Sequence, residues 1–358
     1  MKIIVDKDIP FINGAFEDYA QVVYLPGKEI VTDAVKDADA LVIRTRTKCN
    51  DSLLGGSSVK FIATATIGTD HIDLEYCAKA GICVRNAAGC NAGGVMQYVY
   101  TSLYALACRK GLQLGEGSRY GTIGVIGVGN VGSKVAALGE YLGFEVLRCD
   151  PAKEREQTLA FNNGYIQLKD FKDFYSLDYV LENSDVITLH TDLNPTSRGL
   201  AGEEFFSKMK DGAIFINSSR GEVVQDEALK KFTGKLSGLI LDVWDGEPEI
   251  DLELLSAADI ATPHIAGYSY EGKVNGTVMS VKALGEFFGI EGLKGFSVVP
   301  AEKNSNFFSK GNLTQNQISE YFENIFPIFG HCVDLKNNPQ NFEQLRSNFK
   351  YRREFYVI

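Results

Sequence analysis

The chain alternates short apolar runs with longer stretches in which apolar and polar residues are mixed. In its first part, apolar runs of strand length occupy residues 3–5, 22–24, 40–43, 61–65 and 82–85. Between them, residues 31–39 and 74–80 fit helices. Strands that alternate with helices are typical of βαβ units, whose strands form a parallel sheet. We therefore expect a first doubly wound sheet before residue 90.

A second alternation follows a long predicted helix over residues 93–109, in which apolar side chains recur at helical spacing. Further apolar runs predict strands at residues 122–126, 145–149, 186–189, 213–217, 239–243 and 260–261. This second sheet should be larger than the first. From about residue 289 the composition changes, with frequent Gln, Asn, Phe and Lys, and a helix is predicted over residues 313–329.

A glycine-rich turn lies between the predicted strand at 122–126 and the helix that follows it. Its sequence, Gly127-Val128-Gly129-Asn130-Val131-Gly132, fits the G-x-G-x-x-G fingerprint of dinucleotide-binding βαβ units. The first glycine makes a tight turn, the second lets the backbone approach a pyrophosphate, and the third allows close helix–strand packing. The N-terminus of the following helix would offer N–H groups to the phosphates.

Asp150 follows the next predicted strand, where the fingerprint places an acid that accepts hydrogen bonds from the ribose hydroxyls. A carboxylate there should repel the 2′-phosphate of NADP. The sequence therefore predicts NAD as the cofactor. An ordinary βαβ turn is the alternative interpretation, and it does not explain the acid.

The composition narrows the class of protein without identifying it. A chain of 358 residues should form two or three domains, and 45% hydrophobic with 23% charged residues is an ordinary globular balance. The net charge of −10 argues against nonspecific nucleic-acid binding. No apolar run is long enough to span a membrane, and the N-terminus lacks the pattern of a signal peptide. The seven cysteines include no C-x-x-C pair and the four histidines lack metal-site spacing, so we expect a cytoplasmic protein with reduced thiols and no metal.

Polar residues gather at the ends of several predicted strands, where ligands bind in open α/β sheets. Arg44-Thr45-Arg46-Thr47-Lys48 combines three cations with two hydroxyls, which suits a phosphate or a carboxylate. Thr66 begins a loop with a glycine and further hydroxyls. A solvated charged loop and an ordinary turn into a helix would show the same patterns, so both interpretations stay open.

Three later loops carry residues that could bind a carboxylate and move a proton. Arg220 ends Asn217-Ser218-Ser219-Arg220 and could clamp a carboxylate and polarise a neighbouring carbonyl. His264 follows the last predicted strand, and Glu247 lies upstream in Asp242-Val243-Trp244-Asp245-Gly246-Glu247-Pro248. A histidine paired with a carboxylate can move a proton near neutral pH. A lone histidine is more often structural than catalytic, so a catalytic role for His264 depends on whether it pairs with an acidic side chain.

Together, these loops and the fingerprint resemble the signature motifs of the D-2-hydroxyacid dehydrogenases, over residues 1 to about 288. The resemblance implies two Rossmann-like or flavodoxin-like doubly wound parallel-sheet domains in an α/β fold. Residues 1–93 with 268–289 would bind substrate, and residues 94–267 would bind NAD. Residues 290–358 would form a small α+β domain like the C-terminal dimerisation domain of one branch of the family, which implies a homodimer.

The resemblance also implies roles for individual residues. Arg220 would hold the substrate carboxylate, His264 would take the hydroxyl proton, and Glu247 would keep His264 basic. The substrate would also contact Thr45, Thr66 and Tyr268. Arg44 and Arg46 are further substrate candidates because of their charge, as phosphate ligands. The NAD site would consist of Gly127, Gly129, Asn130, Val131, Gly132, Asp150, Thr191, Ser218, Ser219, Arg220, Asp242 and Gly267.

Four features depart from the family pattern. Ser219 stands where the family often has a cysteine or an alanine, and Arg46 adds a cation where an apolar residue is expected. Ala88 stands where the family usually has a proline before a hinge, and residues 152–173 are longer than expected, which predicts a surface excursion.

Three functions stay open. The first is oxidation of a phosphorylated 2-hydroxy acid, with Arg44, Arg46 and Lys48 as local phosphate ligands and Arg352 or Arg353 as ligands that a partner subunit could supply. The second is a related dehydrogenase acting on phosphoglycerate, glycerate or lactate, and the third is an NAD-sensing binding protein on the same fold.

Overall fold

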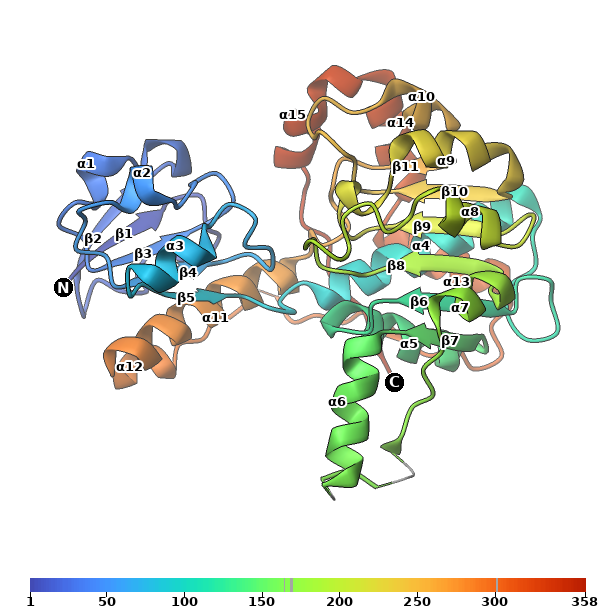
Figure 1. Cartoon of the computed structure of the whole chain (residues 1–358), viewed down its shortest axis with the longest axis horizontal. Coiled ribbons are helices and arrows are strands. Elements are labelled where there is room, and N and C mark those ends of the chain that lie inside the picture. The colour runs from blue at the N-terminus through green and yellow to red at the C-terminus, as the bar shows by residue number, and fades with distance from the viewer. Residues whose placement is uncertain (164, 168–169, 301) are drawn as a thin grey trace. The chain divides into compact units, whose positions relative to one another are not determined.

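A computed structural model describes residues 1–163, 165–167, 170–300 and 302–358 of the chain. The chain divides into two compact units. The smaller unit contains Met1–Asn91 and Ser269–Ser305, and the larger unit contains Ala92–Tyr268 and Asn306–Ile358. Each unit has its own parallel sheet, so the predicted class of two doubly wound α/β sheets is confirmed (Figure 1).

The smaller unit has a five-stranded parallel sheet in the order β2-β1-β3-β4-β5. One face is covered by three short helices and the other mainly by the long helix α11, because alternate side chains of each strand point to opposite faces. The strands are β1 (Lys2–Asp6), β2 (Gln21–Leu25), β3 (Ala40–Ile43), β4 (Phe61–Thr64) and β5 (Cys83–Asn86). The helices are η1 (Gly27–Glu29), α1 (Thr32–Val35), α2 (Asp51–Leu54), α3 (Leu74–Lys79), α11 (Tyr270–Phe288) and α12 (Glu291–Lys294).

The larger unit has a six-stranded parallel sheet in the order β11-β10-β9-β8-β6-β7. Within this sheet the chain begins at β6 and adds β7 on one side. It then returns and adds β8 to β11 on the other side, so the topological switch point lies between β6 and β8. Ligands bind outside the carboxyl ends of strands at such a point. The strands are β6 (Thr122–Ile126), β7 (Glu145–Cys149), β8 (Val186–Leu189), β9 (Ile214–Asn217), β10 (Gly238–Leu241) and β11 (Ile260–Ala261).

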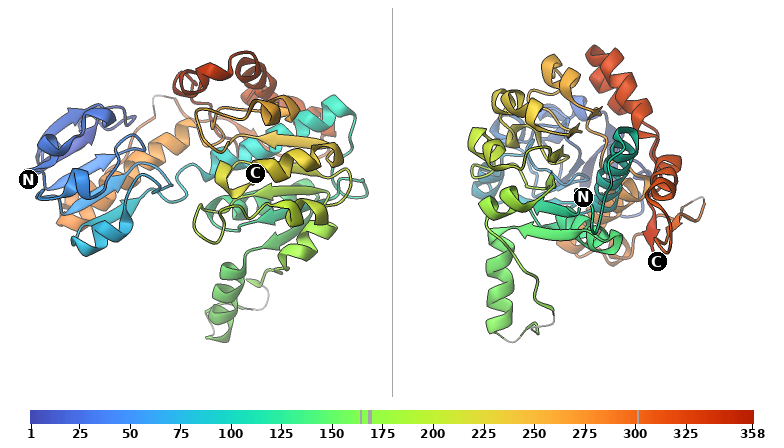
Figure 2. Two further views of the ribbon diagram at one scale, coloured as in Figure 1. Left: turned by 45° about the horizontal axis from the view of Figure 1, so that its top comes forward. Right: turned by 90° about the vertical axis from the view of Figure 1, so that its right-hand side faces the viewer.

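Helices cover both faces of this sheet. One core lies under α4 (Ala92–Lys110), α5 (Asn130–Leu142) and α13 (Gln315–Ile325). The opposite core lies under four shorter helices, which Figure 2 shows on the other side of the strands. They are α7 (Leu177–Asn183), α8 (Glu203–Lys208), α9 (Asp226–Phe232) and α10 (Leu252–Ala257). The turns η3 (Gly221–Val223) and η4 (Thr233–Lys235) precede and follow α9.

The C-terminal segment, residues 306–358, packs onto the larger unit. Phe322 of α13 lies under Tyr104 of α4, with ring centroids 5.5 Å apart. Cys332 accepts a hydrogen bond from the backbone N–H of Ala261 in β11. The segment therefore contributes to both cores of this unit. Its other elements are β12 (Phe307–Phe308), α14 (Ile328–Asn337), η5 (Pro339–Asn341), α15 (Phe342–Ser347) and β13 (Tyr356–Val357).

The structure corrects the helix predicted over residues 313–329. Thr314 and Gln317 form a capping box that begins α13 at residue 315, and the helix ends at Ile325. Pro327 then interrupts it, because the residue before a proline is kept out of the helical conformation. α14 begins directly afterwards, so two helices replace one. The predicted role of residues 290–358 in dimerisation stays a prediction.

The predicted excursion after Asp150 begins with α6 (Pro151–Asn162), which extends away from the sheet in Figure 1. Every residue of this helix is described and none is buried, as expected for a surface excursion. Residues 164 and 168–169, in the rest of the predicted stretch, lie outside the described residues. Across the described ranges, no helix is both long enough and apolar enough to cross a membrane.

Candidate active site

The glycine turn after β6 has the backbone shape that the fingerprint requires. Gly127 has a φ of +86°, and its N–H donates to the carbonyl of Cys149 at 2.9 Å. A Cβ on Gly132 would meet the carbonyl oxygen of Gly127, whereas a Cβ on Gly129 would meet no atom within 4 Å. Gly132 thus allows helix and strand to pack closely, and Gly129 leaves open space where a pyrophosphate would approach.

Asp150 lies at the end of β7 beside this turn. Its Oδ2 accepts from the N–H of Val128 at 2.8 Å, and its Oδ1 accepts from the N–H groups of Ala152 and Lys153. The carboxylate therefore caps α6 and also ties the glycine turn to the neighbouring strand. Asn130 and Val131, which follow the turn, open α5.

Two buried hydroxyls at the carboxyl edge of the sheet fit a hydrogen-bonding ligand. Thr191 lies after β8 and Ser218 after β9. Neither hydroxyl oxygen has a hydrogen-bond partner within the described part of the chain. Buried polar groups are nearly always satisfied in folded proteins, so these two hydroxyls fit a ligand that offers hydrogen-bonding groups at this edge of the sheet.

The turn after β9 is held by a single amide side chain. Asn217 accepts from the N–H and the hydroxyl of Ser219 through Oδ1, and donates to the carbonyl of Arg220 at 3.0 Å. A Cβ on Gly221 would lie 1.9 Å from the backbone of Trp244. The turn therefore packs against the loop after β10, and the half-buried Arg220 lies between these two fixed points.

The loop that carries His264 is held by Asp242, which is completely buried. Oδ1 of Asp242 accepts from the N–H of Ile265 and the hydroxyl of Thr262, and Oδ2 accepts from the N–H of Ala266. Burial raises the pKa of Asp242 despite the opposing effects of His264 and these hydrogen bonds. These hydrogen bonds show that Asp242 fixes the backbone of the loop at Ile265 and Ala266. Gly267, the next residue, is buried.

His264 itself has a left-handed backbone, with a φ of +56°. Such a conformation is uncommon for a residue with a side chain, and it recurs at functional sites where the surrounding structure compensates for the strain. The N–H of His264 donates to the carbonyl of Asp242 at 2.7 Å, which contributes to that compensation.

His264 and Glu247 form a direct pair. The imidazole Nδ1 lies 2.8 Å from Oε2 and 3.2 Å from Oε1 of Glu247. Trp244 positions the carboxylate by donating its N–H to Oε1 at 3.0 Å. Because a carboxylate only accepts, this pairing assigns the proton to Nδ1 and leaves Nε2 as the basic nitrogen.

An arginine that the sequence did not indicate contacts this pair. Arg346 in α15 brings Nη1 to 3.7 Å from Oε2 of Glu247. Burial would raise the pKa of Glu247, but the charge and hydrogen bond of His264 and the charge of Arg346 hold it below its usual value. Glu247 is therefore ionised at neutral pH. No motif marks Arg346, which lies in a polar tail 99 residues after Glu247 in the sequence.

Tyr268 also contacts Arg346. The arginine Nε donates to the phenol oxygen at 3.1 Å, and the guanidinium carbon lies 5.8 Å from the ring centroid. Hydrogen bonds and ion pairs thus connect the loops that carry four predicted residues of the larger unit with Arg346, which was not predicted. The five residues are Asp242, Glu247, His264, Tyr268 and Arg346.

The predicted substrate residues of the smaller unit differ in their surroundings. Arg44 forms ion pairs with Asp6 at 3.2 Å and with Asp8 at 3.3 Å, since β1 and β3 are neighbours and end at the same edge. Thr45 and Arg46, which follow it, are exposed. Thr66 donates to the carbonyl of Gly68 at 3.1 Å.

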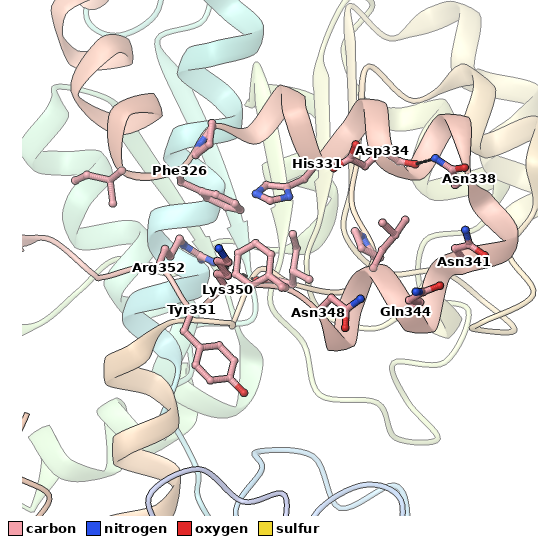
Figure 3. A pocket seen from close by; sticks show the side chains of 16 residues that line it. Phe326, His331, Asp334, Asn338, Asn341, Gln344, Asn348, Lys350, Tyr351 and Arg352 are labelled. Carbon is pink, nitrogen blue, oxygen red and sulfur yellow. Dashed lines mark hydrogen bonds between the residues drawn. The ribbon is translucent and has the colours of Figure 1, made fainter.

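A pocket of about 710 Å³ lies behind the loop of His264, between α14, α15 and the tail that follows them (Figure 3). Pro263 and Ile265, on either side of His264, contribute to its wall. The described residues that line it do not include Arg220, Glu247 or His264. The pocket is therefore distinct from the predicted site of chemistry.

Comparisons with known proteins agree with this geometry. Residues 107–266 match the family "D-isomer specific 2-hydroxyacid dehydrogenase, NAD binding domain". The chain is 45% identical to an erythronate-4-phosphate dehydrogenase of Bacteroides fragilis, over 99% of this chain and 97% of that protein. It is 38% identical to the protein of the same name from Escherichia coli O157:H7, over 100% of this chain and 94% of that one.

Solved structures give the same family. A D-lactate dehydrogenase of Aquifex aeolicus in complex with NAD and lactic acid is 29% identical, with a TM-score of 0.66, over 84% of this chain and all of that chain. An NAD-bound 3-phosphoglycerate dehydrogenase of Entamoeba histolytica is 26% identical, with a TM-score of 0.63, over 84% of this chain and 99% of that one.

Proposed function

This chain belongs to the D-isomer-specific 2-hydroxyacid dehydrogenases, in the branch of the erythronate-4-phosphate dehydrogenases, and we propose that it oxidises 4-phospho-D-erythronate with NAD. The product is 2-oxo-3-hydroxy-4-phosphobutanoate, formed in a step toward pyridoxal 5′-phosphate. The contact between His264 and Glu247 carries the chemical part of this proposal, because alcohol oxidation needs a positioned base.

NAD fits the residues at the carboxyl edge of the larger unit. The glycine turn would receive the pyrophosphate, Asp150 would accept from the ribose hydroxyls, and the hydroxyls of Thr191 and Ser218 would gain partners. NAD supplies the hydride acceptor when it is bound. Ser219, Asp242 and Gly267 support this site by shaping the turns around it.

The protein provides a base for the hydroxyl proton, an arginine that binds the substrate carboxylate, and a glutamate that orients the base. Nε2 of His264 removes the proton of the C2 hydroxyl while the C2 hydrogen leaves as hydride. Ionised Glu247 stabilises the positive imidazole that results. Arg220 binds the carboxylate and polarises the C2 oxygen, which selects 2-hydroxy acids over simple alcohols.

Residues of the smaller unit bind the phosphorylated end of the substrate. Arg46, Thr45 and Thr66 are the proposed contacts, together with Tyr268 of the larger unit. Arg44, which was also predicted to bind substrate, is paired with Asp6 and Asp8. It contributes to the substrate site by holding the loop that carries Thr45 and Arg46.

Two alternatives are weaker. Relatives at 38–45% identity over nearly the whole chain favour a 4-phosphoerythronate substrate over phosphoglycerate, glycerate or lactate. An NAD-sensing binding protein would not need an ionised carboxylate beside a histidine. We further propose that the protein acts in the cytoplasm as a homodimer joined through residues 290–358. The absence of a spanning helix in the described ranges agrees with that compartment.

A steady-state assay tests the function. The purified protein is given NAD and 4-phosphoerythronate, with 3-phosphoglycerate, glycerate and lactate as competing candidates, and with and without a 2-keto acid that could reoxidise bound NADH. We expect the highest kcat/KM with 4-phosphoerythronate and loss of turnover in His264→Ala. Equal or better turnover of an unphosphorylated acid would overturn the proposed substrate. Turnover that survives in His264→Ala would overturn the proposed base.

A further inference from the structure

We propose that Arg346 is a positioning residue that the C-terminal segment supplies to the active site of its own chain, where it holds Tyr268 and shares the charge of Glu247 with His264. The proposal rests on the proposed function, since it assigns His264 as the base. Its geometry is a bridge: Nε donates to the phenol oxygen of Tyr268 at 3.1 Å, and Nη1 lies 3.7 Å from Oε2 of Glu247.

The C-terminal segment is fastened to the catalytic loop by a second arginine. Arg352 is 7% exposed and donates to the carbonyls of Ile265, Ala266 and Tyr268, and to Gly94 of α4 at 2.7 Å. Its guanidinium carbon also lies 4.0 Å from the ring centroid of Phe326, and Figure 3 shows these two side chains together. Because Arg352 binds the residues that follow His264, the segment is tied directly to the loop on which the base lies.

α15 is in turn held by its first residue, Phe342, which is 1% exposed and packs into a core of the larger unit. Arg346 lies one helical turn further along, so it lies on the same side of the helix as Phe342. The arginine is therefore presented by a packed helix and not by a loose tail. The conformational entropy that the Arg346 side chain loses on ordering is therefore lost when the helix packs, before any substrate binds.

Charged or titratable groups with described contacts around the base include Glu247 and Asp242 on the loop after β10, Tyr268 after β11, and Arg346 on α15. Arg220, on the turn after β9, is a further cation that we propose at the same site. Burial opposes the charge on Arg346, but Tyr268, Glu247 and Asp242 raise its pKa above the usual value. Arg346 is therefore always a cation. The buried Asp242 and the half-buried Glu247 thus lie near one imidazole, with a permanent positive charge beside Glu247.

This charge affects the reaction by a simple electrostatic argument. A carboxylate alone stabilises the protonated imidazole, which cannot accept the proton of the substrate hydroxyl. A guanidinium that shares the carboxylate weakens that stabilisation, so more of the enzyme carries the neutral base. The cation thus extends activity toward lower pH while Glu247 keeps the imidazole oriented.

The bond to Tyr268 has a separate effect. A phenol oxygen that accepts from a guanidinium directs its own hydrogen away from that guanidinium. Arg346 therefore orients Tyr268 as a donor, which suits the anionic substrate that we propose it contacts. The two effects predict different kinetic changes, and variants can separate them.

The experiment measures the pH dependence of kcat/KM and kcat for 4-phosphoerythronate oxidation in the full-length enzyme. In Arg346→Met, we expect the acid limb of kcat/KM to move to higher pH by about half a unit to one unit. KM should also rise about three- to tenfold, because Tyr268 loses its orienting bond. Arg346→Lys keeps the charge, so it should restore most of the acid limb but not KM.

Two controls isolate the site. Tyr268→Phe removes the phenol hydroxyl and leaves the cation, so KM should rise while the acid limb stays in place. Lys350→Met removes an exposed positive charge from the same tail without removing a contact to Glu247, so it should match the wild type. Thermal unfolding and NAD titration verify that each variant folds. If Arg346→Met does not fold, Arg346→Gln is used for the same comparison.

The outcomes are distinct. A fall of kcat/KM in Arg346→Met with no shift of the acid limb, or an equal shift in Lys350→Met, overturns the proposal, since either would reflect general structure or net charge. A wild-type enzyme that does not oxidise 4-phosphoerythronate overturns the proposed function instead. In that case the profiles are measured with whichever 2-hydroxy acid the enzyme oxidises, and they still decide the role of Arg346.

Discussion

Arg44 is bound to Asp6, with Nε of the guanidinium 3.2 Å from Oδ2 of a carboxylate that is completely buried. Asp6 is the last residue of β1, and Arg44 directly follows the neighbouring strand β3. An arginine predicted to bind substrate phosphate therefore also neutralises a buried acid. Arg46, two residues later, is exposed. The two arginines should respond differently to mutation.

Arg44→Met should lower the free energy of unfolding by about 1–3 kcal/mol, because it leaves Asp6 buried without its cation. Arg46→Met should raise KM for the phosphorylated substrate about tenfold, from the loss of a charge-assisted hydrogen bond. Urea unfolding and steady-state kinetics measure the two effects. An unchanged KM in Arg46→Met would mean that the phosphate is bound elsewhere.

Replacing Glu247 tests whether its charge is needed. Glu247→Gln keeps the shape of the side chain but removes the negative charge that stabilises the protonated imidazole. We expect kcat/KM to fall about 10²–10³-fold, with little change in unfolding temperature. Glu249→Gln removes an exposed charge from the same loop and serves as the matched control. Similar losses in both variants would contradict a specific role for Glu247.

Alanine substitutions at two glycines of the fingerprint should affect different properties of the protein. In Gly132→Ala, the added methyl would lie 1.9 Å from the carbonyl oxygen of Gly127, so helix and strand must separate and stability should fall by about 1–3 kcal/mol. In Gly129→Ala, the methyl meets no atom within 4 Å. It should weaken NAD binding at least tenfold with a smaller loss of stability, because it lies where the pyrophosphate approaches. Calorimetry of unfolding and of NAD binding separates the two results.

Asp150 should determine the choice of cofactor. The wild type is expected to prefer NAD over NADP, because a carboxylate repels the 2′-phosphate. Asp150→Ser keeps a residue that can cap α6 but removes the charge and the bond to Val128. The ratio of kcat/KM for NAD to that for NADP should fall about tenfold or more. A wild type that works better with NADP would refute the assignment.

Asp226 should reduce stability above about pH 6. Burial, with smaller contributions from Asp245 and Asp251, raises its pKa to about 6. The folded protein therefore holds this proton more tightly than the unfolded chain, so the free energy of unfolding falls as pH rises from about 4 to 6. Because the group is partly exposed, Asp226→Asn should gain only about 1 kcal/mol at pH 7.5. The gain should vanish below pH 4, and urea unfolding at both pH values measures it.

Local patterns accounted for most of the fold. The apolar runs at residues 40–43 and 186–189 coincide with β3 and β8, because buried parallel strands are continuous apolar segments that need no distant information. The glycine turn was equally readable, since its glycines serve a local backbone shape. The helix predicted over residues 313–329 was wrong in extent, because periodicity alone did not take account of Pro327.

The sequence by itself determined the fold class, the cofactor turn and the family, because each depends on short segments whose residue types have a local physical reason. Only the tertiary structure decided which charges meet. Asp6 and Arg44 are 38 residues apart, and Arg346 reaches Glu247 from a tail that no motif marks. Ion pairs form where strand ends and packed helices bring charged side chains together. No local sequence pattern indicates which distant residues will meet in this way. The sequence thus indicated the base and its carboxylate, and the packing of the C-terminal segment added the cation beside them.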